Sequence, residues 1–168
     1  MVNNNGIQLW TVPTTGDYTI RAVGANAGQF STGTGQNGNR RGIDISTTIT
    51  LNKGEVIKIL VGQQGGINSW SQSGGGGGTF VVRDIKTPII VAGGGGQLGS
   101  LGGYLSGPYS DASSSTNGNG GIASVNGSNV TLLTNGGSGG NGGSFAYENS
   151  GGGGLIGNGI KDAESITP

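Results

Sequence analysis

The sequence predicts an all-β domain with almost no α-helix, in which ordinary strands are combined with packed segments of consecutive glycine. Three observations lead to this prediction. Apolar and polar residues alternate along residues 43–51, which is the pattern of a strand with one buried face. Glycine supplies 41 of the 168 residues, and 32 of these 41 lie after residue 61. No stretch of helix length shows the 3.6-residue apolar periodicity of an amphipathic helix.

The first third of the chain is typical of antiparallel β-sheet. A turn at residues 14–17 leads into a strand at 18–23, and a polar turn at 52–55 leads into a more fully buried strand at 56–61. Trp10 and Tyr18 fall on strand-like segments and are expected in the core. The inward-pointing side chains of the strand at 43–51 are expected to be Ile43, Ile45, Thr47, Ile49 and Leu51.

Strand-like runs and glycine runs alternate in the rest of the chain. Strands are predicted at 79–83 and 88–92, and a hairpin at 122–133 with Asn126 and Gly127 at its turn. The glycines predicted to have a structural role form three runs: Gly74, Gly75, Gly76, Gly77 and Gly78; Gly93, Gly94, Gly95 and Gly96; and Gly151, Gly152, Gly153 and Gly154.

Two interpretations of these glycine runs are open. Glycine-rich chains are commonly flexible linkers, although linkers usually contain alternating serine, which residues 74–78 lack. The other interpretation is a packed rod of the polyproline II type, a three-residue helix without internal hydrogen bonds whose N–H and C=O groups point sideways. Because glycine has no side chain, neighbouring rods can then approach closely and pair laterally. We favour the packed rods, in which a methyl group on Gly76 would lie between touching backbones.

The composition excludes several functional classes. Histidine and cysteine are absent, so zinc sites of Cys and His, disulfides, cysteine nucleophiles and Ser-His-Asp triads are excluded. Eight acidic residues balance eight basic ones, which disfavours nucleic-acid binding. Residues 33–38 match the pattern G-x-G-x-x-G, but they precede a predicted strand rather than a helix, so they do not predict a nucleotide site. We therefore expect no enzyme activity, no catalytic residue, no cofactor and no metal.

Five aromatic residues are candidate contacts for a partner. They lie in the segments that connect glycine runs, which would emerge as loops at the ends of a bundle of rods. The alternative is that they cap the ends of the bundle and shield glycine backbones. These residues are Trp70, Tyr104, Tyr109, Phe145 and Tyr147.

Four stretches, in order, resemble the glycine-rich domain of the anaplastic lymphoma kinase and leukocyte tyrosine kinase receptors. They are WTVPTTGDY at 10–18, ILVGQQG at 59–65, GGGGGTFVV at 74–82 and IVAGGGG at 90–96, and the resemblance spans roughly residues 7–159. It implies a jelly-roll-like sandwich of the tumour-necrosis-factor type with an inserted bundle of polyglycine II helices, placed outside the cell and involved in recognising a cytokine. A looser resemblance is to the glycine-rich tips of phage tail fibres, in which loops between polyglycine helices touch the host surface.

The expected function is non-enzymatic recognition or adhesion by one domain, residues 1–168. Residues 1–92 are expected to form mainly sandwich strands, and residues 62–159 mainly glycine helices and their loops, interleaved with strands. A rigid glycine scaffold would present loops to a protein or glycan partner, outside a cell, on its surface or on a virion. Aliphatic stretches of at most about four residues predict no membrane insertion. Self-association stays open, and the alternatives are a subunit of an extracellular filament or an ice-binding protein.

Overall fold

The computed structural model describes residues 2–4, 6–28, 41–66, 74–84, 87–96, 122–126 and 129–132. Every regular element in this part of the chain is a β-strand, and every strand pair is antiparallel, which confirms the all-β class. None of these residues forms a helix long and apolar enough to span a membrane. The strands are β1 (Val2–Asn4), β2 (Ile7–Thr11), β3 (Gly16–Val23), β4 (Asp44–Leu51), β5 (Val56–Leu60), β6 (Thr79–Asp84), β7 (Thr87–Ala92), β8 (Ile122–Asn126) and β9 (Asn129–Leu132).

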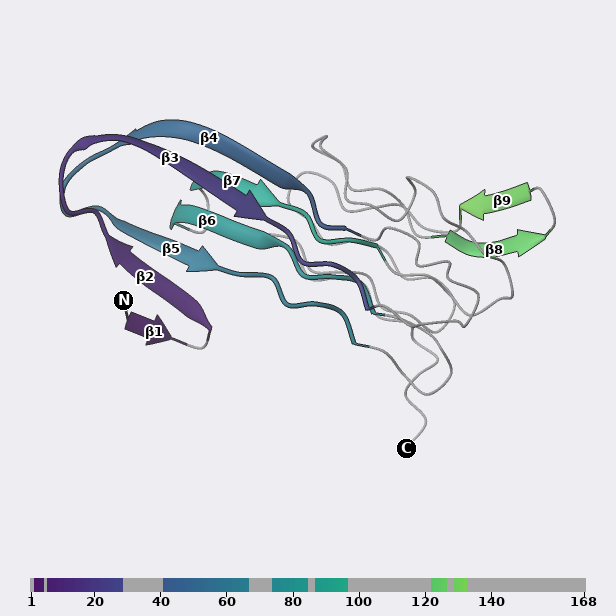
Figure 1. Cartoon of the computed structure of the whole chain (residues 1–168). Coiled ribbons are helices and arrows are strands. Elements are labelled where there is room, and N and C mark those ends of the chain that lie inside the picture. Colours follow the sequence, from purple (N-terminus) through teal and green to yellow (C-terminus); the bar gives the residue numbers. More distant parts are fainter. Residues whose placement is uncertain are drawn as a thin grey trace.

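Seven of these strands form two layers (Figure 1). One layer is a five-stranded sheet in the order β1-β2-β5-β6-β7, and the other is the pair β3-β4. The strand β8 pairs with β9 as the predicted hairpin, which is thereby confirmed, and the last register pair is Asn126 with Asn129. The predicted turn residue Gly127 lies outside the described residues.

The strand β4 has the burial pattern that its sequence predicts. Its inward-facing residues are half-buried, and Leu51 at its end is fully buried, while the residues between them are exposed. The partner strand β3 begins at Gly16, two residues earlier than predicted. This earlier start follows from pairing, because Gly16 lies opposite Leu51 and Asp17 lies opposite Thr50, whose hydroxyl donates to the Asp17 carboxylate at 2.6 Å.

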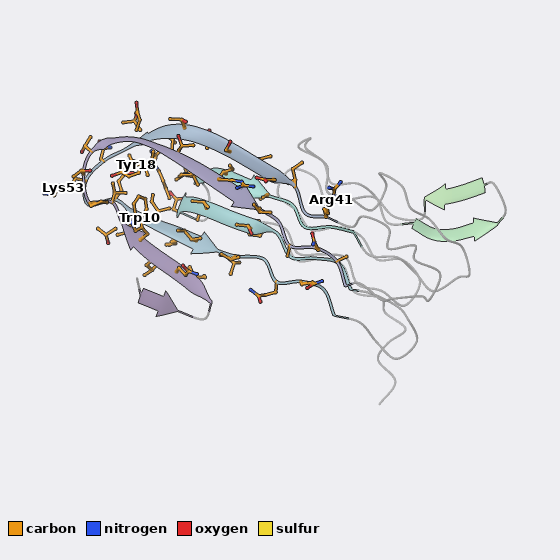
Figure 2. All side chains as sticks on the ribbon, in the orientation of Figure 1. Trp10, Tyr18, Arg41 and Lys53 are labelled. Carbon is orange, nitrogen blue, oxygen red and sulfur yellow. The ribbon has the colours of Figure 1, made fainter. Side chains whose placement is uncertain are left out.

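The core lies between the two layers. Trp10 of β2 and Tyr18 of β3 both pack against it, as predicted, and their rings meet edge to face at a centroid distance of 5.4 Å (Figure 2). The Tyr18 hydroxyl also donates to the Thr14 carbonyl oxygen at 2.8 Å. The buried residues of the core cluster are Val12, Ala22, Leu51, Ile57, Val81, Ile90 and Ala92.

Inward-facing side chains become smaller toward one end of the sandwich. Facing sheets stand about 10 Å apart where large side chains separate them, so small residues allow the two layers to converge. At this end β3, β5 and β7 continue into glycine segments, and β4 and β6 are preceded by them (Figure 1). The decreasing series are Tyr18, Ile20, Ala22 and Gly24 along β3; Val81, Thr79 and Gly77 backward along β6; and Ile90, Ala92 and Gly94 along β7.

The prediction of a more fully buried strand at 56–61 is wrong in one respect. Val56 is 46% exposed, Leu60 39% and Val61 47%. Alternate residues of β5 face away from the β3-β4 layer, so only one face of the strand enters the core. On the outward face, register pairs align four apolar residues across four strands, which we call the apolar row: Ile7, Leu60, Phe80 and Val91.

Candidate functional site: a bundle of glycine segments

Five segments that extend the strands lie side by side and form what we call the glycine bundle (Figure 1). Two of them consist entirely of glycine, and the others contain mostly small or polar residues. Figure 2 shows the contrast with the sandwich, where side chains crowd together near Trp10 and Tyr18. The segments of the bundle are residues 24–28, 41–43, 62–66, 74–78 and 93–96.

Residues 74–78 are at the centre of the glycine bundle because they are hydrogen-bonded to three other segments. Their backbone groups pair with residues 62–66, 24–28 and 93–96, although the 24–28 segment continues the other layer of the sandwich. The layers therefore merge into one hydrogen-bonded unit at this end. By donor and acceptor, the bonds are Gly74 to Gly66, Gly77 to Gln63, Gly76 to Gly95, Ala25 to Gly77 and Gly28 to Gly74, with N···O distances of 2.8 to 3.0 Å.

The bonds of the central segment recur every three residues. Gly74 and Gly77 donate to Gly66 and Gln63, so donors and acceptors are both three positions apart. The same two residues accept from Gly28 and Ala25, again with a spacing of three. Because a β-strand repeats every two residues, this repeat differs from that of the antiparallel β-pairs in the same structure.

Many glycines of the bundle have no room for a side chain. At seven of them, an ideal Cβ would lie under 3.0 Å from a backbone carbonyl oxygen of another segment, a distance that real Cβ atoms essentially never show. Because the obstructing atoms belong to backbone, no side-chain rotation can relieve the overlap. These glycines are Gly24, Gly28, Gly42, Gly62, Gly65, Gly76 and Gly94.

Two glycines of the same bundle do have room for a side chain. A Cβ on Gly66 would meet nothing within 4 Å, and one on Gly74 would find its nearest atom, the Gly66 nitrogen, at 3.5 Å. Gly77 and Gly78 are intermediate, with nearest distances of 3.0 Å to the Gln63 nitrogen and 3.1 Å to the Phe80 ring. The contrast provides matched control positions within one segment.

Residues 24–28 and 41–43 were not predicted to belong with the glycine segments, because they lie before residue 62 and contain no uninterrupted run of glycine. Residues 24–28 read Gly-Ala-Asn-Ala-Gly, and Ala27 there is fully buried. Residues 41–43 link the layers, since Ile43 accepts from Gly24 and donates to the Gly93 carbonyl oxygen at 3.0 Å. A run of small residues directly after a predicted strand is the signal that would have identified the 24–28 segment.

Charge is almost absent from the described part of the glycine bundle, where Arg41 is the one ionisable side chain. The nearest ion pair in sequence lies on the sandwich surface, where Arg21 of β3 binds Asp44 of β4, with Nε donating to Oδ1 at 2.8 Å. The hydrogen bonds from Arg21 lower the pKa of Asp44, and the same bonds raise the pKa of Arg21. Both side chains are exposed, so solvent screens the pair.

Several predicted residues fall outside the described part of the chain. They are the five aromatic candidates Trp70, Tyr104, Tyr109, Phe145 and Tyr147, and the glycines Gly151, Gly152, Gly153 and Gly154. In the part that is described, no three His, Cys, Asp or Glu residues gather into a group that could hold a metal. The expectation that the whole chain lacks a metal, a cofactor and a catalytic residue stays a prediction.

Comparison with known proteins gives a short similarity to part of a receptor. No family model matches the chain. The chain is 48% identical over 62 residues to the leukocyte tyrosine kinase receptor of Mus musculus, a stretch that covers 36% of this chain and 6% of that receptor. The similarity therefore relates about a third of the chain to a small part of a receptor tyrosine kinase.

Proposed function

We propose that the glycine bundle is a set of polyglycine II helices attached to a jelly-roll-like sandwich of the tumour-necrosis-factor type. The three-residue repeat of hydrogen bonds supports this assignment, because a polyproline II helix has three residues per turn and no internal hydrogen bonds. The positions without space for a Cβ support it as well, since close lateral packing of such helices requires glycine. A flexible linker would have neither feature.

On this scaffold the protein acts as a non-enzymatic recognition or adhesion module at a cell or virion surface. The similarity to a receptor supports a receptor-type module and an extracellular or cell-surface location. The proposed partner is a protein or a glycan, and the proposed contact residues are Trp70, Tyr104, Tyr109, Phe145 and Tyr147. The observation that carries the proposal is the backbone pairing of residues 74–78 with three segments, because it makes the glycine region a stiff platform.

Binding to intact cells and to a printed glycan array tests this function. The fluorescently labelled full chain is compared with Gly76→Ala, which places a methyl against the Ala25 backbone, and with Gly74→Ala, where a methyl fits. We expect the wild type and Gly74→Ala to bind a common cell surface or glycan, and Gly76→Ala to bind at least tenfold more weakly. No binding by the wild type, or equal binding by all three proteins, would contradict the proposal.

Self-association into a filament is a second candidate, and the apolar row favours it. Ile7, Leu60 and Val91 are each more than one third exposed, and they form a continuous line with Phe80 across the five-stranded sheet. The chain has no net charge that would keep copies apart. A second copy of the same sheet face is the occupant that this candidate requires.

Sedimentation at several protein concentrations tests self-association. We expect the wild type to sediment faster as its concentration rises, and Leu60→Ser to remove this dependence. Val56→Ser is the matched control, because Val56 is as exposed as Leu60 on the same strand but lies outside the apolar row. A wild type that stays monomeric throughout, or equal effects of the two variants, would exclude the apolar row as the interface.

A further inference from the structure

Thr79 is the one buried polar side chain among the residues whose side chains are described, with 6% of its surface exposed. It is the first residue of β6, directly after the central glycine segment. Its hydroxyl donates to the Val23 carbonyl oxygen at 2.7 Å and accepts from the Gly62 nitrogen at 3.1 Å. One hydroxyl thus uses its donor and an acceptor site at the same time.

The two partners of Thr79 belong to different layers of the sandwich. Val23 is the last residue of β3, in the two-stranded layer, and Gly62 follows β5, in the five-stranded layer. The inward-facing neighbours at this level are small and buried, with Ala92 opposite Thr79 in the register and Ala22 beside Val23. Thr79 therefore joins the layers where large side chains no longer separate them.

Thr79 continues the pattern of contacts that the central glycine segment makes. Two residues earlier, Gly77 donates its N–H to Gln63 and accepts from the N–H of Ala25. Thr79 contacts Gly62 in the same 62–66 segment and Val23, the residue directly before the 24–28 segment. It does so with its side chain because its backbone is engaged in the sheet. The hydroxyl is thus the last lateral link of the glycine bundle before the sandwich begins.

From this geometry we infer that Thr79 is a positioning residue that fixes the register of the glycine bundle relative to both layers of the sandwich. The partner Gly62 lies one residue before Gln63, and the partner Val23 lies two residues before Ala25. Gln63 and Ala25 are the residues that bond to Gly77 of the central segment. When the hydroxyl is lost, Thr79 no longer fixes the positions of the 24–28 and 62–66 segments relative to each other. The bonds of Gly77 then open more often, while the β3-β4 ladder keeps its own pairing.

If Thr79 acted only by packing, the shape of a β-branched side chain would be sufficient, because such a shape suits any strand. Thr79→Val keeps that shape and removes the hydroxyl, whereas Thr79→Ser keeps the hydroxyl and removes the methyl. The two variants therefore separate hydrogen bonding from packing. Thr19→Val is a control, because the Thr19 hydroxyl also bonds across segments, to Thr48 at 2.9 Å, but lies on the exposed face of β3.

Amide hydrogen exchange of the full chain, followed residue by residue by NMR, measures the effect. In Thr79→Val we expect the amides of Ala25, Gly77 and Gly95 to exchange at least tenfold faster than in the wild type, and the amides of the β3-β4 ladder to change less than threefold. In Thr79→Ser and Thr19→Val the bundle amides should stay within threefold of the wild type.

Three results would overturn the inference. Unchanged bundle amides in Thr79→Val would show that the hydroxyl does not hold the bundle. An equal acceleration of bundle and β3-β4 amides would indicate general destabilisation instead. If Thr79→Val does not fold, Thr79→Ser decides, because faster bundle exchange in that variant would assign the role to the methyl group. None of these measurements depends on a partner, so they can succeed or fail separately from the proposed recognition function.

Discussion

Gly76 lies against the backbone of Ala25, which belongs to the opposite layer of the sandwich. A Cβ on Gly76 would stand 2.7 Å from the carbonyl carbon of Ala25 and equally close to that of Asn26. Glycine at this position is therefore a packing requirement. Gly76 donates to Gly95, and Gly95 donates to Ala25, so hydrogen bonds hold the backbones together at the point where a methyl would have to fit.

We predict that Gly76→Ala lowers the free energy of unfolding by more than about 2 kcal/mol, as overpacking against rigid neighbours does. Gly74→Ala should change it by no more than about 1 kcal/mol, because the nearest atom to the new methyl is 3.5 Å away. Urea denaturation of both variants measures the difference. A Gly76→Ala loss no larger than about 1 kcal/mol would argue against close packing at this position.

The fully buried Leu51 gives a prediction for the sandwich. Leu51→Ala should cost about 2 to 5 kcal/mol, because it removes a side chain with no exposed surface and leaves a cavity between the layers. Val56→Ala serves as the control, since Val56 is 46% exposed and should cost less than about 1 kcal/mol. Thermal or urea unfolding measures the stability of both variants. Similar losses of stability in the two would show that the core lies elsewhere.

The Arg21–Asp44 pair predicts a small dependence of stability on pH. The hydrogen bonds from Arg21 keep the pKa of Asp44 below its unfolded value, so the pair stabilises the fold above that value and loses its effect as the pH falls through the folded pKa. At low salt, the melting temperature of the wild type should exceed that of Asp44→Asn at neutral pH. The difference should begin to shrink below about pH 4, where the unfolded carboxylate takes up its proton, and should vanish only once the pH is below the lowered folded pKa.

Salt provides the control for this pair. Because both side chains are exposed, about 1 M salt should also remove the difference in melting temperature at neutral pH. A difference that persists in acid or in high salt would mean that the two residues contribute through something other than their charges.

The aromatic candidates give a prediction that separates their two interpretations. If Trp70, Tyr104 and Tyr109 contact a partner, changing each to alanine should weaken binding to the cell surface or glycan at least tenfold and leave the melting temperature nearly unchanged. If they cap the bundle, the same variants should lower the melting temperature, and any loss of binding should be a consequence of that destabilisation. Binding and thermal unfolding are therefore measured on the same preparations, and a variant that affects neither would remove that residue from the candidate site.

Local sequence patterns were sufficient to predict most of the strands and much of the core, although β1 was not predicted. The alternation in residues 43–51 predicted which side of β4 is buried, because successive side chains of any strand point to opposite faces. The core positions of Trp10 and Tyr18 followed from their strand-like surroundings. The hairpin of β8 and β9 was predictable for the same reason, since its pairing is local in sequence.

The order of the sheets and the membership of the glycine bundle were decided only by tertiary structure. Local sequence does not show that β2 pairs with β5, or that residues 24–28 lie beside residues 74–78, because these partners are far apart along the chain. Sequence also does not separate Gly74 from Gly76, which are chemically identical neighbours. Gly74 can be replaced and Gly76 cannot, because a second backbone approaches only Gly76 closely. The space around an α-carbon depends on how the whole molecule packs and not on the residue itself.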